Sequence, residues 1–167
     1  MKILVTTASK HGATGEIGEV IAGILRDAGL EVETHAPEDV SALDGYDAVV
    51  LGSAVYAGHW LEPARTFAES HGPDLANLPV WLFSSGPIGD PPLPEGEAAE
   101  GVALASRIGA REHRTFSGSL DRSRLGIVER AVTGVLRAPD GDFRDLGEIG
   151  GWADAIADAL AREEVPA

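Results

Sequence analysis

The sequence of 167 residues contains no cysteine. Disulfide bridges, thiolate-bound zinc, iron–sulfur clusters and cysteine nucleophiles are therefore excluded, because each of them requires a Cys sulfur. The chain is long enough to bury a hydrophobic core without a disulfide or a structural metal. We therefore expect a single domain over residues 1–167 whose stability comes from packing.

Long apolar runs are missing too. No stretch contains the roughly 20 apolar residues that a membrane-spanning helix needs. A soluble, cytoplasmic protein is expected on this ground, with at most peripheral contact to a membrane.

Basic residues are scarce. The 13 Lys and Arg stand against 27 Asp and Glu, which gives a net charge of −14. A chain of this charge is poorly suited to the phosphate backbone of nucleic acids, so no nucleic-acid partner is expected. Its acidic surface serves either solubility or the docking of a basic partner.

Several well-known motifs are also absent. The sequence has no GxGxxG, no GK[ST] and no GxSxG, which argues against dinucleotide binding, P-loop NTP hydrolysis and an α/β-hydrolase nucleophile. The positions at which a receiver domain carries its acidic pocket and its phosphoacceptor hold Thr6, Thr7 and Gly52. A phosphorelay function is therefore rejected.

What the sequence does have is an alternation of short apolar runs and amphipathic segments. Strands are predicted over 3–7, 30–33, 47–54, 79–83 and 113–119, and helices over 17–28, after Pro63, over 97–108 and around 152–160. The run 47–54 is apolar on both faces, as central parallel strands are. This order predicts an α/β protein with a doubly wound parallel sheet, whose ligands bind at the carboxyl ends of the strands.

The loop after the first predicted strand has the residue types of an anion site. It reads SKHGAT, from Ser9 to Thr14, and leads directly into a helix. Hydroxyl groups, a glycine and backbone N–H groups at a helix amino terminus attract an anion. Without the lysine and magnesium-binding hydroxyl of a P-loop, this loop fits a phosphomonoester better than a nucleoside triphosphate.

This loop resembles the [ST]-x-x-G-x-[ST] loop of flavodoxins, which wraps the ribityl phosphate of FMN. The resemblance implies FMN as the cofactor and a flavodoxin-like three-layer sandwich, with a five-stranded parallel sheet in the order 2-1-3-4-5 and helices on both faces. The phosphate ligands that it implies are Ser9, Lys10, His11, Gly12, Ala13 and Thr14. Ala13 stands where many flavodoxins have Asn, which leaves more of the binding to backbone amides.

By the same resemblance, two more loops are expected to hold the flavin ring. The loop after the third strand supplies Ala54, Val55, Tyr56, Ala57 and Gly58, and the loop after the fourth strand supplies Ser84, Ser85, Gly86, Pro87, Ile88 and Gly89. Either Tyr56 or Trp60 stacks on the ring, or both only cover the sheet edge. Gly58 is expected to let a peptide turn its carbonyl toward the reduced flavin. No catalytic side chain and no metal are expected, and His59 and Asp90 are interpreted as ordinary loop residues.

The chain as a whole resembles the flavodoxin-domain group that contains menaquinone-dependent protoporphyrinogen IX dehydrogenase. The likeness lies in SKHGAT, YDAVVLGSAVYAGHW, FSGSL and GGWADAIADAL, and in an extra segment of about residues 120–148 before the last helix. Within this segment an amphipathic, locally basic helix is predicted, with Leu125, Val128, Val132, Val135 and Leu136 on one face. This helix either meets a membrane surface, a quinone or an anionic porphyrin, or packs on the domain's own core.

Three functions remain open on the sequence. The first is an FMN-dependent oxidoreductase that reduces a quinone or oxidises a porphyrinogen, in which FMN supplies the redox chemistry and the protein its position and potential. The second is an electron carrier of flavodoxin type that docks basic redox partner proteins. The third is a flavin-free interaction module, which Ala13 would favour. A monomer or a homodimer is expected.

Overall fold

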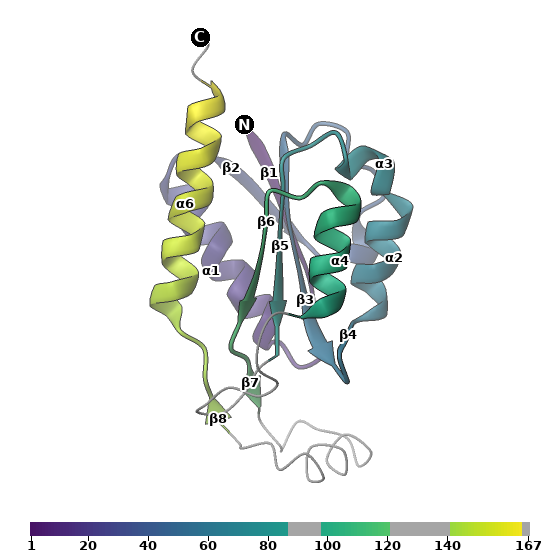
Figure 1. Ribbon diagram of the computed structural model, residues 1–167. Coiled ribbons are helices and arrows are strands. Elements are labelled where there is room, and N and C mark those ends of the chain that lie inside the picture. Colours follow the sequence, from purple (N-terminus) through teal and green to yellow (C-terminus); the bar gives the residue numbers. More distant parts are fainter. Residues whose placement is uncertain (87–97, 121–140, 165–167) are drawn as a thin grey trace.

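The structure, a computed structural model, describes residues 1–86, 98–120 and 141–164 (Figure 1). Its strands are β1 (Lys2–Ala8), β2 (Glu31–His35), β3 (Ala48–Tyr56), β4 (His59–Trp60), β5 (Val80–Ser85), β6 (Glu112–Phe116), β7 (Ser119–Leu120) and β8 (Gly141–Asp142). Its helices are α1 (Ala13–Asp27), the 3-10 helix η1 (Pro37–Asp39), α2 (Glu62–Ser70), α3 (Gly72–Leu75), α4 (Ala99–Ile108) and α6 (Leu146–Glu164). Within these residues, none of the helices has the length and apolar composition that crossing a bilayer requires.

The central sheet confirms the predicted architecture. Its strands lie in the order β2-β1-β3-β5-β6, and each neighbouring pair in this order is parallel. Counted along the chain, these five strands have the predicted order 2-1-3-4-5. Helices α1 and α6 cover one face of the sheet, and α2, α3 and α4 cover the other (Figure 1). The short β4 was not predicted, and it pairs antiparallel with the end of β3.

Each face of the sheet has its own hydrophobic core. Along β3, Val50 packs into the cluster with α1 and α6, whereas Val49 and Leu51 pack into the cluster with α2 and α4. The side chains alternate because successive residues of a strand point to opposite faces. The run that is apolar on both faces therefore does form a central strand, as its composition predicts.

The predicted fifth strand, 113–119, needs a correction. The strand β6 ends at Phe116, and Ser119 and Leu120 form β7, which pairs antiparallel with β8. The Phe143 N–H donates to the Gly118 carbonyl at 3.1 Å, so this part of the chain bonds to the returning limb of the extra segment instead of to β5. The amphipathic helix predicted over residues 125–136 lies outside the described residues.

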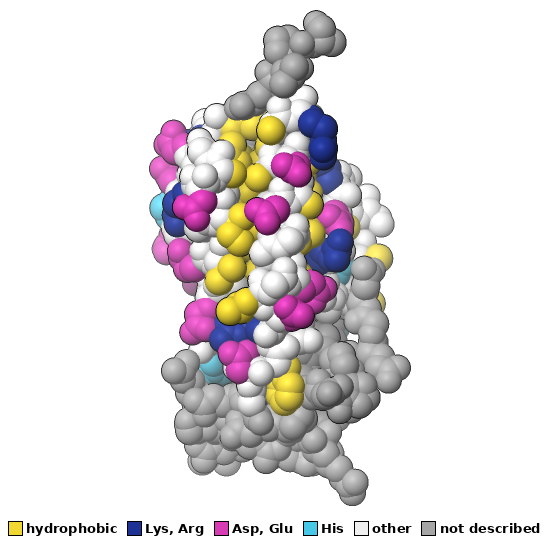
Figure 2. All heavy atoms as spheres, turned by 90° about the vertical axis from the view of Figure 1, so that its left-hand side faces the viewer, with side chains coloured by type: hydrophobic (Ala, Val, Ile, Leu, Met, Phe, Trp, Pro, Cys, Tyr) yellow, Lys and Arg dark blue, Asp and Glu magenta, His cyan; other side chains and the backbone are white. Residues whose placement is uncertain are grey.

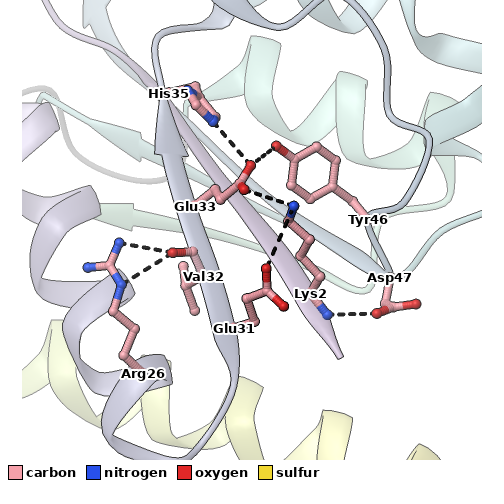
Figure 3. A network of polar contacts seen from close by, with 8 residues as sticks. All are labelled: Lys2, Arg26, Glu31, Val32, Glu33, His35, Tyr46 and Asp47. Carbon is pink, nitrogen blue, oxygen red and sulfur yellow. Dashed lines mark hydrogen bonds and ion pairs between the residues drawn. The ribbon is translucent and has the colours of Figure 1, made fainter.

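A polar network holds the amino-terminal end of the sheet at its β2 edge (Figure 3). The Lys2 ammonium lies 2.8 Å from Glu33, and the Tyr46 hydroxyl and the His35 ring also contact that carboxylate. The Lys2 backbone N–H donates to the Asp47 carboxylate at 2.6 Å. The hydrogen bond from Lys2, followed by those from Tyr46 and His35, lowers the pKa of Glu33 to about 2. Charged side chains on this edge strand also disfavour pairing with another chain.

Candidate functional site

The loop after β1 forms the amino-terminal end of α1. Gly12 is the N-cap residue, with φ 95° in the left-handed region, which glycine adopts without steric penalty. Its N–H donates to Ser9 Oγ at 3.0 Å, and its carbonyl accepts from the Glu16 N–H at 2.9 Å. Among the described residues, no side chain caps this helix. The first-turn amides thus lie at the positive end of the helix dipole, available to an anion.

Close packing fixes this helix terminus above β1. A Cβ atom at Gly18 would lie 2.6 Å from Thr7 Cγ2, so the backbone of α1 packs directly on the Thr7 side chain of β1. The Thr14 side chain is 2% exposed and anchors the first turn from the inside. Beside this turn, a hollow of about 350 Å³ opens toward β2 and includes Ser9 and Gly15 in its wall. The predicted phosphate loop therefore leads into a closely packed helix turn and borders an open hollow.

The second predicted loop is shorter than expected. Ala54, Val55 and Tyr56 belong to strand β3, so the turn itself consists of Ala57 and Gly58 only. These two residues have φ 50° and 81°, the left-handed pair that a type I′ hairpin turn requires. Because β4 pairs antiparallel with β3, the chain reverses its direction here and runs back along the end of β3.

The two aromatic residues of this hairpin have different surroundings. Trp60 is 2% exposed, and its indole N–H donates to Ser84 Oγ at 2.8 Å, so its ring lies inside the protein. Of the two aromatic residues that were candidates for stacking on the flavin, Trp60 is therefore ruled out by its burial. Tyr56 is 36% exposed. Its ring lies 6.5 Å from the His11 ring in an edge-to-face contact, and Lys10 Nζ lies 5.7 Å from its centroid. Tyr56 thus joins the hairpin to the phosphate loop.

The third predicted loop begins later than expected. Ser84 and Ser85 are the buried last residues of β5, and Ser84 Oγ also lies 2.9 Å from His113 Nε2. Gly86 then leaves the sheet, and a Cβ atom there would lie 3.1 Å from Val55 Cβ. A larger residue at this position would press on Val55, so glycine lets the chain that leaves β5 pass close to the end of β3. Pro87, Ile88, Gly89 and Asp90 lie outside the described residues.

An arginine that the sequence analysis missed also reaches this site. Arg144 Nη1 lies 2.6 Å from Glu16 Oε2 and donates to the Ala13 carbonyl at 3.3 Å. Its Nε and Nη2 donate to the two oxygens of Asp142, at 2.8 and 2.6 Å. These hydrogen bonds from Arg144 lower the pKa of Asp142. No local sequence pattern could predict this contact, because Arg144 and Ala13 lie 131 residues apart.

The comparisons with known proteins agree with this geometry. The family model of the flavodoxin domain matches residues 4–146, and the chain belongs to this family. Among curated proteins, protoporphyrinogen IX dehydrogenase [quinone] of Escherichia coli K12 is 28% identical over 87 residues, which are 50% of this chain and 48% of the relative. The chain thus spans about half the length of the curated relatives it matches.

Solved structures show the same fold. A flavodoxin from the domain Archaea superposes with a TM-score of 0.66 at 18% identity, covering 96% of this chain and 99% of the other. Flavodoxin 1 from Bacillus cereus gives a TM-score of 0.64 at 17% identity, with 99% and 100% covered. Rubredoxin oxygen:oxidoreductase from Desulfovibrio gigas gives 0.70 at 15% identity, with 99% of this chain but 37% of the other covered.

Membership of the flavodoxin family makes this chain an FMN redox protein that transfers electrons to or from a partner. The described residues fit that cofactor. The uncapped, glycine-led terminus of α1 suits a phosphate group. It follows β1, and the carboxyl ends of β1 and β3 lie side by side at the switch point of the sheet, where ligands of this fold bind.

Proposed function

We propose that the chain holds FMN by its phosphate at Ser9–Thr14 and passes electrons or a hydride between the flavin and a quinone or a porphyrinogen. The carrying observation is the uncapped amino terminus of α1 behind the left-handed Gly12. The name of the Escherichia coli relative, which specifies protoporphyrinogen IX and a quinone, supports the choice of substrate class. FMN, once bound, supplies the one- and two-electron chemistry.

The protein's own part is binding and placement. The first-turn amides from Ala13 onward would bind the phosphate, and Ala13 contributes its backbone alone because its side chain has no polar atom. Tyr56 would lie against the flavin at the edge of the hairpin, with Ala54, Val55, Ala57 and Gly58 next to it. On the other side, the chain that leaves β5 after Ser84 and Ser85, from Gly86 through Gly89, would meet the pyrimidine oxygens.

Binding is tested first. The apoprotein is titrated with FMN, riboflavin and FAD while flavin fluorescence is followed, and FMN should bind far more tightly than riboflavin. Gly12→Ala should reduce that preference, since a left-handed alanine costs about 1–2 kcal/mol and shifts the first-turn amides.

Gly29→Ala is the matched control, because Gly29 has φ 89° but lies beyond the other end of α1. Both variants carry a similar backbone strain, and only Gly12→Ala should lower the ratio of FMN to riboflavin affinity. Equal affinity of the wild-type protein for FMN and riboflavin would contradict the phosphate site.

A second candidate function is that of an electron carrier for basic proteins. It is supported by the acidic residues spread over the face that carries α1 and α6 (Figure 2), among them the exposed Glu19, Asp27, Asp154 and Asp158. A carrier should reduce a basic redox protein at a rate that falls steeply with salt. An enzyme should turn over a quinone or protoporphyrinogen IX at a rate that salt changes little.

A further inference from the structure

The returning limb of the extra segment lies against the phosphate loop. The strands β7 and β8 pair antiparallel, with Asp142 opposite Ser119. Two residues after Asp142, the side chain of Arg144 contacts the first turn of α1. The α6 helix begins at Leu146 and starts with a cap of its own, since the Glu148 N–H donates to Asp145 Oδ1 at 3.0 Å. Arg144 is thus held between a paired strand and a capped helix.

The guanidinium has little freedom to move. Its bidentate pair with Asp142 is supported by the Arg144 backbone N–H, which donates to Asp142 Oδ1 at 3.1 Å. The Arg144 side chain is 14% exposed, although Glu16 and Asp142 are 61% and 53% exposed. A partly buried guanidinium with several charged acceptors has less freedom to move than the partners of most surface ion pairs.

Glu16 explains why a fixed positive charge matters at this place. Its carboxylate belongs to the first turn of α1, the same turn whose amides would receive the phosphate. A carboxylate there suits the empty helix terminus but repels a phosphate dianion. Arg144 pairs with this carboxylate and also bonds the Ala13 carbonyl, which belongs to the first peptide of the helix.

We propose that Arg144 is a positioning residue of the phosphate loop, which fixes the Ala13 peptide and neutralises Glu16 so that the first-turn amides can hold a phosphomonoester dianion. This inference rests on the proposed FMN site. It gives the returning limb of the extra segment a role in holding the cofactor. This role is separate from the contact with a membrane, a substrate or the core that was considered for the predicted helix with Leu125 and Leu136. The residue does not itself touch the reacting atoms.

The test compares FMN with riboflavin, which lacks the phosphate. Arg144→Gln in the apoprotein should weaken FMN binding about tenfold and riboflavin binding less than about twofold. Arg144→Lys keeps the positive charge but loses the planar, bidentate guanidinium. Its FMN affinity should lie between that of the wild-type protein and that of Arg144→Gln. Arg111→Gln is the matched control, because Arg111 pairs with Glu163 near the other end of α6. Circular dichroism and thermal unfolding check that each variant folds.

A second substitution, which removes the charge of Glu16, distinguishes the proposed role of Arg144 from a simple loss of packing. Glu16→Gln in the Arg144→Gln background should restore several-fold of the lost FMN affinity, because it removes the carboxylate that Arg144 had neutralised. A double variant no better than Arg144→Gln would overturn the inference, as would equal weakening of FMN and riboflavin, or unchanged FMN affinity. If Arg144→Gln does not fold, Arg144→Lys carries the comparison. Wild-type protein that does not distinguish FMN from riboflavin would refute the proposed site itself.

Discussion

Ala57 is the one described residue other than glycine with a positive φ, at 50°. An L-residue in the left-handed region costs about 1–2 kcal/mol, and the hairpin requires this conformation at both turn positions. Ala57→Gly removes that penalty but adds about 0.4–1 kcal/mol of chain entropy to be lost on folding. The balance predicts a gain of about 0.5–1 kcal/mol in the free energy of unfolding.

The measurement is urea unfolding of the apoprotein, with the midpoint and slope fitted together. Ala157→Gly is the control, because Ala157 lies in the middle of α6, where glycine should cost about 1 kcal/mol. Ala57→Gly should raise the midpoint and Ala157→Gly should lower it. If both variants lose similar stability, Ala57 is not left-handed and the type I′ turn is wrong.

Three further predictions concern stability. Gly52→Ala should cost about 1–3 kcal/mol in chemical denaturation, because its Cβ would lie 2.1 Å from the Phe83 ring. Asp145→Ala should cost about 1 kcal/mol by the same assay, since the Glu148 N–H loses its cap. Glu33 has its pKa lowered from 4.5 to about 2, so its stabilising effect is present above pH 4.5 and is lost as the pH falls toward 2. Glu33→Gln should therefore flatten that part of an acid-unfolding curve, and an unchanged curve would contradict the network.

Local patterns predicted the five parallel strands, and the family resemblance predicted their order. Two features were predictable because each is encoded by residues that are adjacent in the sequence. They are the run around Val49 and Val50, which is apolar on both faces, and the glycine-containing loop after β1. The hairpin turn escaped prediction because Ala57-Gly58 lacks the Asn-Gly or Asp-Gly signature of a type I′ turn. Trp60 is buried in the core under α2 and α4, and its indole N–H bonds to Ser84, 24 residues away. No periodicity in the sequence reveals either contact.

For the extra segment, the sequence pattern alone suggests an experiment whose result would be ambiguous. Its amphipathic pattern invites deletion of residues 120–148 as a test of substrate or membrane contact. Such a deletion would also remove β8 and Arg144, and with them the ion pair to Glu16 and the bond to Ala13. A loss of activity would then report cofactor binding and substrate contact together. Substitutions confined to residues 121–140 leave the β7–β8 pairing and Arg144 unchanged in sequence, so only they can separate the two effects.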